Sequence, residues 1–378
     1  MNARRVAIVT RRFWPLVGDE ETALADLAVG LANAGVRPTI VTAAWGKHWP
    51  ATFAFEGIPV VRLPKPAGHW WGDWGYAKRL RQWLHSQRER IDVALVASVG
   101  ADAEAAVAAM GTSVPVVVMG RTSDFAKLSK KPHLLPDAFV TCAEPTEEIV
   151  ADPHVDQLFK VIRPGVQLPQ LISGDQRRRA RLALAKACGD ARISALTPLA
   201  IAAGRIDQRG DYSTFIRAWK SVLARHADAR LWIFGEGRQR ATLWDEVDNA
   251  NLRGRVFLPG GVDILSEAFS AADLFLASDD NSSISPATLS AMAAGLPVVA
   301  RASSAAGNLL TSNHDGLLFD AEDSEDLQVA IERLLAQPTL RNVLGTNARR
   351  LVKEQYNLED RVRRFIELFD ELQQGKAS

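Results

Sequence analysis

Residues 276–300 read LASDDNSSISPATLSAMAAGLPVVA, and this stretch decides the fold. It combines the end of an apolar strand, a polar loop, a short helix and a second apolar strand. Ser285 is a preferred N-cap residue and Pro286 suits the first helical position, so the sequence predicts a helix over Pro286–Ala294 that Gly295 ends. A helix that begins after a strand presents unpaired N–H groups and a positive dipole end to an anion. The stretch therefore predicts a phosphate site in an α/β fold.

Apolar strand patterns alternate with helical patterns along the whole chain. Arg5–Thr10 is a buried-strand pattern, Glu20–Ala34 is an amphipathic helix, and a second series of the same kind starts at Pro198. Such alternation predicts doubly wound parallel sheets, and 378 residues suggest two domains. The predicted pieces are a first Rossmann-like domain over 1–168, a connection with a basic helix over 169–196, a second Rossmann-like domain over 197–356, and a C-terminal helix over 357–378.

The composition excludes several protein classes. Hydrophobic residues make up 47% of the chain and charged residues 24%, which argues against disorder. The net charge of +1 argues against a dedicated nucleic-acid binder. Cys142 and Cys188 form no spacing motif, which is typical of a protein in the reduced cytosol. We predict a cytoplasmic protein, because Arg4 and Arg5 lead directly into a strand rather than a signal sequence and no apolar run approaches the roughly 18 residues of a spanning helix.

The stretch that contains Pro286 also resembles the donor-binding signature of the family 4 glycosyltransferases of GT-B fold. Ala291–Val299 matches the second half of that signature closely. Ser282 and Ser290 stand where the family has the two acids of its Glu-x7-Glu pair, whose carboxylates grip the donor sugar and the nucleotide ribose. The resemblance implies a GT-B fold, in which two Rossmann-like domains face a central cleft and the last helix crosses back to the first domain.

Further segments resemble the same family in the same order along the chain. Ala200–Gly210 is similar to the strand-Gly-Arg-x3-Lys-Gly motif, and it places Arg205 and Arg209 at the two cation positions that hold the donor diphosphate. Leu231–Gly237 resembles the strand-Gly-x-Gly step, and Val256–Gly260 resembles the strand whose end meets the base. The alternative for the two arginines is an ordinary surface position, with one of them paired to Asp207 or Asp211.

The resemblance implies a set of donor contacts. Gly18 lies in the loop after the first strand, where a glycine lets backbone N–H groups approach a phosphate; the alternative is an ordinary turn. Asp279 and Asp280 are alternative acids for the missing pair, or else solvated loop residues. The predicted donor-binding residues are Gly18, Gly204, Gly235, Gly237, Leu258, Ser282, Ser283, Ile284, Ser285 and Ser290.

Arg121 follows the predicted strand 116–120, close to the point where many family members have a histidine beside the reacting bond. A guanidinium there can stabilise negative charge on the leaving diphosphate, so Arg121 joins Arg205 and Arg209 as a candidate catalytic residue. The alternative is a salt bridge between Arg121 and Asp124.

The segment His69–Trp83 mixes aromatic and basic side chains. Trp70, Trp71 and Trp74 are candidate acceptor-binding residues, because aromatic and basic side chains together suit a sugar acceptor, an anionic lipid surface or a protein partner. The alternative is that several tryptophans pack into the core of the first domain while the basic side chains are solvated.

No motif in the sequence indicates a metal site or a tightly bound cofactor. The Gly-x-Gly at 235–237 lacks the third glycine of a dinucleotide fingerprint, and the acidic pair at 279–280 lacks a third ligand in spacing. The resemblance implies a metal-independent glycosyltransferase that takes a nucleotide-diphosphate sugar as co-substrate, retains the anomeric configuration and serves a carbohydrate or glycolipid acceptor, with possible peripheral contact to a membrane. A non-catalytic relative that acts as a binding or partner subunit is the alternative, because both acids of the pair are replaced.

Overall fold

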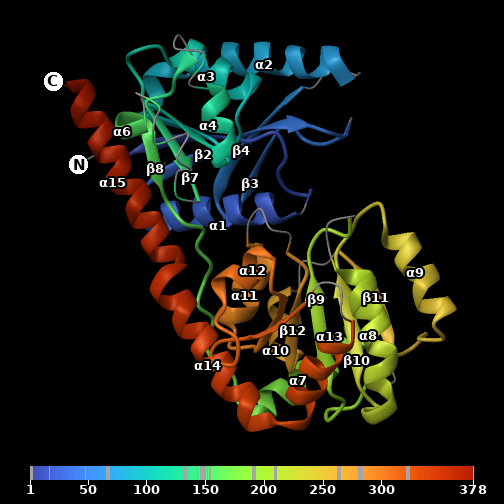
Figure 1. The fold of residues 1–378 in the computed structure, drawn as a ribbon. Helices are drawn as coiled ribbons and strands as arrows, with labels where there is room; N and C mark the ends of the chain where they lie inside the picture. The colour runs from blue at the N-terminus through green and yellow to red at the C-terminus, as the bar shows by residue number, and fades with distance from the viewer. Residues whose placement is uncertain are drawn as a thin grey trace. The chain divides into compact units, whose positions relative to one another are not determined.

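The structure is a computed structural model that describes residues 3–16, 18–46, 48–64, 69–128, 130, 134–142, 144, 150, 152, 155–189, 193–207, 211–261, 265–279, 284–320 and 324–377. The chain forms two compact units. Residues 1–165 and 358–378 make the first unit, and residues 166–357 make the second (Figure 1).

The first unit contains an eight-stranded sheet in the order β3-β4-β2-β1-β5-β6-β7-β8. All neighbouring pairs are parallel except β3 and β4. The strands are β1 (Arg5–Val9), β2 (Arg37–Ala44), β3 (Thr52–Phe55), β4 (Ile58–Pro64), β5 (Val93–Val96), β6 (Val116–Met119), β7 (Ala138–Thr141) and β8 (Phe159–Val161).

Helices cover both faces of this sheet (Figure 1). One core joins the sheet to α2 (His69–Ser86), α3 (Ala101–Met110) and α4 (Thr122–Leu128) through side chains such as Leu80 and Phe125. The other core joins it to α1 (Asp19–Asn33) and α15 (Leu358–Ala377) through side chains such as Leu27 and Phe365. The short helices η1 (Arg88–Arg90) and α6 (Val155–Leu158) complete the described part of this unit.

The second unit contains a six-stranded parallel sheet in the order β11-β10-β9-β12-β13-β14. Its strands are β9 (Leu199–Ala203), β10 (Arg230–Phe234), β11 (Val256–Gly260), β12 (Leu274–Ala277), β13 (Val298–Arg301) and β14 (Leu317–Phe319). This order is that of the doubly wound Rossmann fold, so the predicted fold class is confirmed.

Helices also cover both faces of the second sheet. Trp219, Leu243 and Ile331 close one core, and Leu184, Phe269 and Leu289 help to close the other. The helices are α7 (Gly174–Ala187), α8 (Tyr212–Arg225), α9 (Arg240–Asn249), α10 (Leu265–Ala271), α11 (Pro286–Ala293), α12 (Ala305–Leu309), α13 (Ser324–Ala336) and α14 (Pro338–Gln355).

The segment 169–196, predicted as a connection, contributes α7 to the second unit. Arg181 of this helix is buried and donates to the carbonyl oxygens of Ala271 (2.9 Å) and Thr197 (2.6 Å). Its guanidinium also lies 2.9 Å from the carboxylate of Asp273. These contacts fix α7 against α10 and the start of β9, so this part of the chain packs as an element of the second unit.

Strand β3 is an antiparallel edge strand that the sequence did not predict. Phe55 pairs with Ile58 across a two-residue turn. Both turn residues, Glu56 and Gly57, have positive φ values of 48° and 79°. A tight hairpin turn needs such angles, and Glu-Gly is a weaker sequence signal for it than Asn-Gly or Asp-Gly. The short helices α4 and α12 were also not predicted.

Asp92 anchors the start of β1 and gives a pH-dependent contribution to the free energy of unfolding. Its carboxylate accepts hydrogen bonds from the backbone N–H of Arg5 (2.7 Å) and from the guanidinium Nη2 of Arg5 (2.6 Å), and these bonds lower the pKa of Asp92. A depressed carboxyl pKa stabilises the fold above the unfolded pKa of about 4, and the contribution is lost as the pH falls through the folded pKa. We expect Asp92→Asn to lower the free energy of unfolding by about 1 kcal/mol at pH 7, because both side chains are partly exposed and solvent screens the pair.

Urea unfolding of Asp92→Asn and of the wild type, followed by circular dichroism at neutral and at acidic pH, checks this expectation. The difference between the two proteins should shrink at acidic pH. Glu89→Gln is the matched control, because Glu89 is an exposed acid close by in η1. A difference of the same size at both pH values contradicts the assignment.

Candidate functional site

The order of the second sheet locates its candidate site. Successive strands are added on one side of β9 and then on the other, so the order reverses between β9 and β12. In open α/β sheets of this kind, ligands bind at the carboxyl ends of the strands beside that reversal. The residues that follow β9, β10 and β12 there are 204–207, 235–239 and 278–279.

The glycine turns after β9 and β10 interlock. The N–H of Ile206 donates to the carbonyl of Glu236 at 3.0 Å. A Cβ at Gly235, whose φ is 143°, would lie 1.9 Å from the carbonyl oxygen of Gly204, and a Cβ at Gly237 would lie 1.9 Å from that of Ile206. The close approach of the two turns therefore requires both glycines. Donor contact by Gly204, Gly235 and Gly237 remains a prediction.

Arg205 follows Gly204 at this edge, and its side chain is exposed. Within the described part of the chain its guanidinium forms no ion pair with a carboxylate. Asp211, an alternative partner, instead lies 3.3 Å from Nε of Arg301 at the end of β13. Arg209 lies outside the described residues. The structure thus presents one of the two predicted cations at the expected edge of the sheet.

The pair Asp211–Arg301 was missed by the sequence reasoning. Burial raises the pKa of Asp211, the negative charge of Asp279 raises it further, and the guanidinium of Arg301 opposes both effects. These three charges gather at the ends of β12 and β13 and at the start of α8. The sequence signal that could have revealed this pair is Arg301, an arginine at the end of the apolar strand β13.

Ser278 and Tyr212 were missed as well. The hydroxyl of Ser278 donates to the phenol oxygen of Tyr212 at 2.8 Å. A Cβ at Gly204 would lie 3.0 Å from that phenol oxygen and 3.6 Å from the hydroxyl oxygen of Ser278. The buried Tyr212 therefore packs against the turn after β9 at Gly204, next to Arg205, and helps to fix the backbone there.

The predicted start of α11 is confirmed. Pro286 is its first residue, and the hydroxyl of Ser285 accepts the N–H of Thr288 at 3.1 Å. The carboxylate of Asp279, only 5% exposed, accepts the N–H of Ser285 and the hydroxyl of Thr288, both at 2.7 Å. Proline has no N–H, and a carboxylate at a helix N-terminus offsets the helix dipole. The start of α11 therefore has fewer free N–H groups and a weaker positive potential for a phosphate than its sequence predicted.

We expect Thr288→Val to destabilise the second unit by about 2 kcal/mol, because the buried carboxylate of Asp279 would lose the hydrogen bond from this hydroxyl. The matched control is Thr288→Ser, which keeps the hydroxyl and should lose less stability. Thermal unfolding of both variants measures the difference. Equal destabilisation by valine and serine would show that the hydrogen bond does not matter.

The other donor-binding residues predicted on α11 and in the loop before it differ in burial, and some lie outside the described residues. Ile284 is partly buried against the core beneath α11. Ser290 is half-buried on α11. Ser282 and Ser283 lie outside the described residues, as does Asp280. The carboxylate of Asp279 accepts hydrogen bonds from Ser285 and Thr288 at the start of α11. It therefore does not project from the loop as a substitute for the missing Glu pair.

Leu258 near the end of β11 has a buried side chain. Its carbonyl oxygen accepts Nη2 of Arg240 at 2.9 Å. Glu236, between the two glycines of the β10 turn, accepts the N–H of Gly261 at 3.1 Å and lies 3.9 Å from Nε of Arg240. Arg240 and Glu236 are thus charged side chains at this end of the edge that the sequence reasoning did not single out.

Gly18 in the first unit is the N-cap of α1 and has an extended backbone, with φ at −173°. A Cβ there would lie 2.4 Å from Oε2 of Glu21. The other carboxylate oxygen of Glu21 accepts Nε of Arg12 at 2.7 Å. A carboxylate beside Gly18 disfavours a phosphate at this point, so the predicted donor contact of Gly18 gains no support from the local charge.

Arg121 forms the salt bridge that was its alternative interpretation. Its Nε lies 3.3 Å from Oδ2 of Asp124, and the same oxygen accepts the backbone N–H of Arg121 at 3.2 Å. The side chain is mostly exposed, so the ion pair contributes little to stability. A role for Arg121 beside the leaving group remains a prediction.

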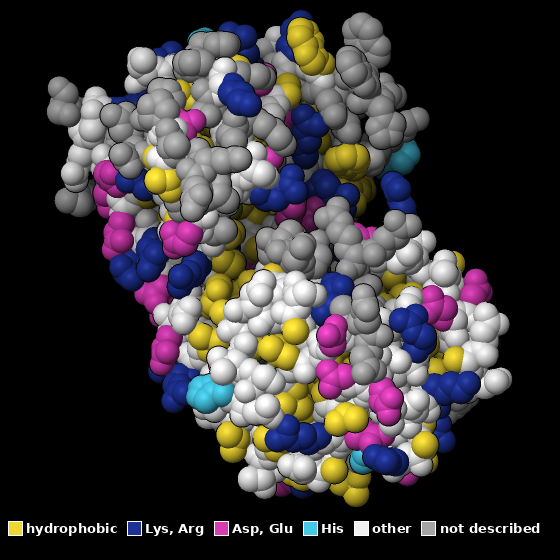
Figure 2. Space-filling model, in the orientation of Figure 1, with side chains coloured by type: hydrophobic (Ala, Val, Ile, Leu, Met, Phe, Trp, Pro, Cys, Tyr) yellow, Lys and Arg dark blue, Asp and Glu magenta, His cyan; other side chains and the backbone are white. Residues whose placement is uncertain are grey.

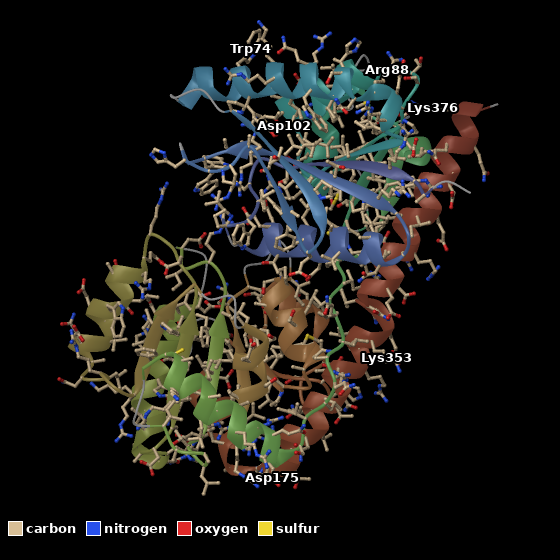
Figure 3. The ribbon with its side chains drawn as sticks, turned by 180° about the vertical axis from the view of Figure 1, so that it is seen from behind. Trp74, Arg88, Asp102, Asp175, Lys353 and Lys376 are labelled. Atoms are coloured by element: carbon tan, nitrogen blue, oxygen red, sulfur yellow. The ribbon has the colours of Figure 1, made fainter. Side chains whose placement is uncertain are left out.

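The aromatic segment on α2 divides between the surface and the core. Trp74 is 78% exposed, whereas Tyr76 is fully buried and Trp83 packs partly against the core. Figure 3 shows Trp74 on the outer side of α2 and Asp102 of α3 beneath that helix. The side chains of Trp70 and Trp71 lie outside the described residues. Of the described tryptophans of this segment, Trp83 packs partly against the core and Trp74 does not, so the alternative that several tryptophans are buried there holds in part for Trp83 alone.

The described residues show neither a membrane-spanning helix nor a cluster of metal ligands. No described helix combines the length and apolar character needed to cross a bilayer. No described group of three or more His, Cys, Asp or Glu side chains is placed to hold a metal ion. On the face drawn in Figure 2, basic and acidic side chains are interspersed over each unit, in keeping with the small net charge.

Comparisons with known proteins match this architecture. The structure of Anabaena HepE in complex with UDP and glucose superposes with a TM-score of 0.76 at 15% identity, over 97% of this chain and 99% of that one. The family model described as glycosyl transferases group 1 matches residues 192–351, and the glycosyl transferase 4-like domain model matches residues 20–143. By these matches the chain belongs to the family 4-like, group 1 glycosyl transferase family and has the GT-B fold.

Two curated relatives from Rhizobium meliloti (strain 1021) are named lipopolysaccharide core biosynthesis glycosyltransferases. LpsE is 28% identical over 162 residues, which cover 43% of this chain and 46% of the relative. LpsD is 27% identical over 192 residues, which cover 51% of this chain and 55% of the relative. The matched part is thus about half the length of these relatives.

Proposed function

We propose that this family member moves a sugar from a nucleotide-diphosphate sugar to an acceptor hydroxyl. The observation that carries the proposal is the exposed guanidinium of Arg205, which follows β9 at the reversal of the strand order and has no carboxylate partner among the described residues. Guanidinium groups bind phosphates through two parallel N–H···O bonds, and ligands of doubly wound sheets bind at this edge.

The reaction breaks the bond between the anomeric carbon and the β-phosphate oxygen. A new bond forms between that carbon and the acceptor oxygen, the hydroxyl proton is released, and negative charge grows on the departing nucleoside diphosphate. Arg205 stabilises this charge, with Arg209 proposed as the second cation and Arg121 as a third. Because Asp279 already offsets the start of α11, the guanidiniums carry more of the stabilisation than the helix does.

The donor is held by the second unit in this proposal. The turns at Gly204, Gly235 and Gly237 and the end of β11 at Leu258 border the nucleotide. The loop 282–285 and Ser290 face the sugar and ribose, where Ser290 offers a neutral hydrogen bond in place of a carboxylate. UDP-hexoses are the first donors to test, because the HepE structure contains UDP and glucose. Retention of the anomeric configuration and activity without a bound metal or cofactor are part of the proposal.

The acceptor is proposed to be a carbohydrate or glycolipid bound by the first unit. The names of LpsE and LpsD, which refer to lipopolysaccharide core biosynthesis, support a saccharide acceptor. The exposed ring of Trp74 on α2 is a candidate contact, as are Trp70 and Trp71. A cytoplasmic location with peripheral contact to a membrane accords with such an acceptor.

A ligand panel tests the proposal. Thermal unfolding is measured with UDP, GDP, ADP and dTDP, and with the matching monophosphates and inorganic phosphate as controls. We expect one diphosphate to raise the midpoint more than its monophosphate does, because the second phosphate reaches Arg205. Release of sugar or transfer to a saccharide from the matching nucleotide sugar then shows turnover, and proton NMR of the product shows the anomeric configuration. Binding without any turnover would favour a non-catalytic relative, and no response to any nucleotide would refute the donor site.

A further inference from the structure

The carboxyl edge of the first sheet carries a group of tryptophans that the proposed function does not use. Trp14 follows β1, and Trp45 and Trp49 follow β2. Trp14 is 45% exposed and Trp45 is 44% exposed, while Trp49 is half-buried. We call these three residues the tryptophan platform. The strand order reverses close by, between β1 and β5, where doubly wound sheets bind their ligands.

A buried arginine holds the platform in place. Arg62 of β4 donates from Nη2 to the carbonyl of Trp14 at 2.8 Å and from Nη1 to that of Pro50 at 3.1 Å. Its guanidinium lies 4.1 Å from the ring centre of Phe53 and 4.9 Å from that of Trp49. Cation–π contacts at a buried site contribute more than exposed ones, so this single side chain ties the loops after β1 and β2 to the sheet.

The exposed rings are also fixed individually. Nε1 of Trp45 donates to the carbonyl of Arg11 at 2.7 Å. The ring of Trp14 packs 5.8 Å from the ring of Phe53, centre to centre. A ring that is already immobilised loses little conformational freedom when it binds a ligand, so these tryptophans are pre-organised for stacking.

Two ion pairs lie next to the platform. Arg11 binds Asp102 through Nε (2.8 Å) and Nη2 (3.0 Å), and Arg12 binds Glu21. Asp102 and Glu21 are buried, whereas both arginine side chains remain partly exposed. Each pair is neutral overall, so these four side chains favour a neutral ligand with hydroxyl groups over a phosphate.

These features define the chemistry of the occupant. The C–H face of a pyranose ring packs on an aromatic face, while its hydroxyls accept from guanidinium N–H groups. Two half-exposed rings are too small an area for a stable protein interface, which buries about 1,600 Å² in total. The paired charges remove the attraction that an anionic lipid surface would need.

We infer that the tryptophan platform binds a pyranose ring of a saccharide, with Trp14 and Trp45 as the stacking residues and Arg62 as the positioning residue. This inference rests on the proposed function, in which the first unit holds a carbohydrate acceptor. It assigns one sugar ring to the loops after β1 and β2, in addition to the candidate contact of Trp74 on α2.

Saturation-transfer NMR on the full chain tests the inference. The probes are methyl α-glucopyranoside, methyl α-galactopyranoside and a deacylated lipopolysaccharide core oligosaccharide. We expect saturation of the ring C–H protons in the wild type, and a dissociation constant about tenfold higher in Trp14→Ala and in Trp45→Ala. Trp45→Phe keeps an aromatic face but loses the hydrogen bond to Arg11, so it should retain most of the binding. Val329→Ala is the control: it shortens an exposed apolar side chain of α13 in the second unit (55% exposed) and should bind like the wild type.

Two further measurements distinguish a failure of this inference from a failure of the proposed function. The thermal shift caused by the nucleoside diphosphate should be unchanged in every tryptophan variant, which shows that the chain is folded and that its donor site is intact. Arg62→Lys should weaken saccharide binding without removing a ring, as a positioning role requires. If Trp14→Ala and Trp45→Ala bind all probes as the wild type does, or if the wild type binds none of them, the inference is overturned. Failure of the nucleotide measurement instead refutes the proposed function.

Discussion

Arg205→Ala is expected to lower kcat/KM for sugar transfer by roughly 100- to 1,000-fold, the range typical of losing one preorganised charge contact in a transition state. The diphosphate gains negative charge as the glycosidic bond breaks, and Arg205 is the described cation that follows β9 without a carboxylate partner among the described residues. The fall should appear mainly in kcat, because the interaction strengthens as the leaving group departs. Initial rates with a saturating acceptor and a varied nucleotide sugar measure it.

Two matched variants sharpen this test. Arg205→Lys keeps the positive charge but loses the planar fork, so its rate should lie between those of the alanine variant and the wild type. Arg217→Ala removes an exposed arginine from α8 and should leave turnover unchanged. A full rate in Arg205→Ala, or an equal loss in Arg217→Ala, would remove this residue from the mechanism.

Gly235→Ala is expected to destabilise the second unit by about 4 kcal/mol or more, at the far end of the range for single substitutions. The new methyl group would overlap the carbonyl oxygen of Gly204, 1.9 Å away, and the φ of 143° is also unfavourable for alanine. The clash is with backbone that belongs to two interlocked turns, so no side chain can move aside to relieve it.

Gly189→Ala separates the two causes. Gly189 also has a positive φ, 74°, but a Cβ there meets no atom within 4 Å among those described. Its cost should therefore be about 1 kcal/mol, the penalty of the backbone conformation alone. Urea unfolding of both variants gives the comparison. Similar stability losses at the two positions would mean that the turns after β9 and β10 relax more easily than their contacts indicate.

The elements of this fold that depend on local sequence were predicted correctly. Ser285 and Pro286 begin α11 because capping and the fixed φ of proline act within a few residues. The alternation of strands and helices was likewise readable, because buried parallel strands are nearly continuous apolar runs. The edge strand β3 was not, because its residues are only partly buried and its turn lacks the usual Asn-Gly or Asp-Gly pair.

The candidate site was harder to predict, because its charges are paired across long sequence separations. Asp211 at the start of α8 meets Arg301 at the end of β13, and Arg11 after β1 meets Asp102 of α3 in the first unit. Asp279 was a plausible displaced acid until its two hydrogen bonds to the start of α11 were visible. A motif can show which residue types belong at an edge, but the pairing that decides which charges stay available depends on the tertiary fold.

The return of α15 to the first unit has a consequence for biosynthesis. Val362, Phe365 and Phe369 of this helix are buried in the core that also holds β1 and α1. Along the sequence, residues 166–357 separate that helix from the rest of its unit, and Val166 and Asn357 pair with each other as a β-bridge. On a translating ribosome, domains fold as units once their residues have emerged. The central unit can therefore fold first, while the earlier-made strands wait for the last helix before their core is complete.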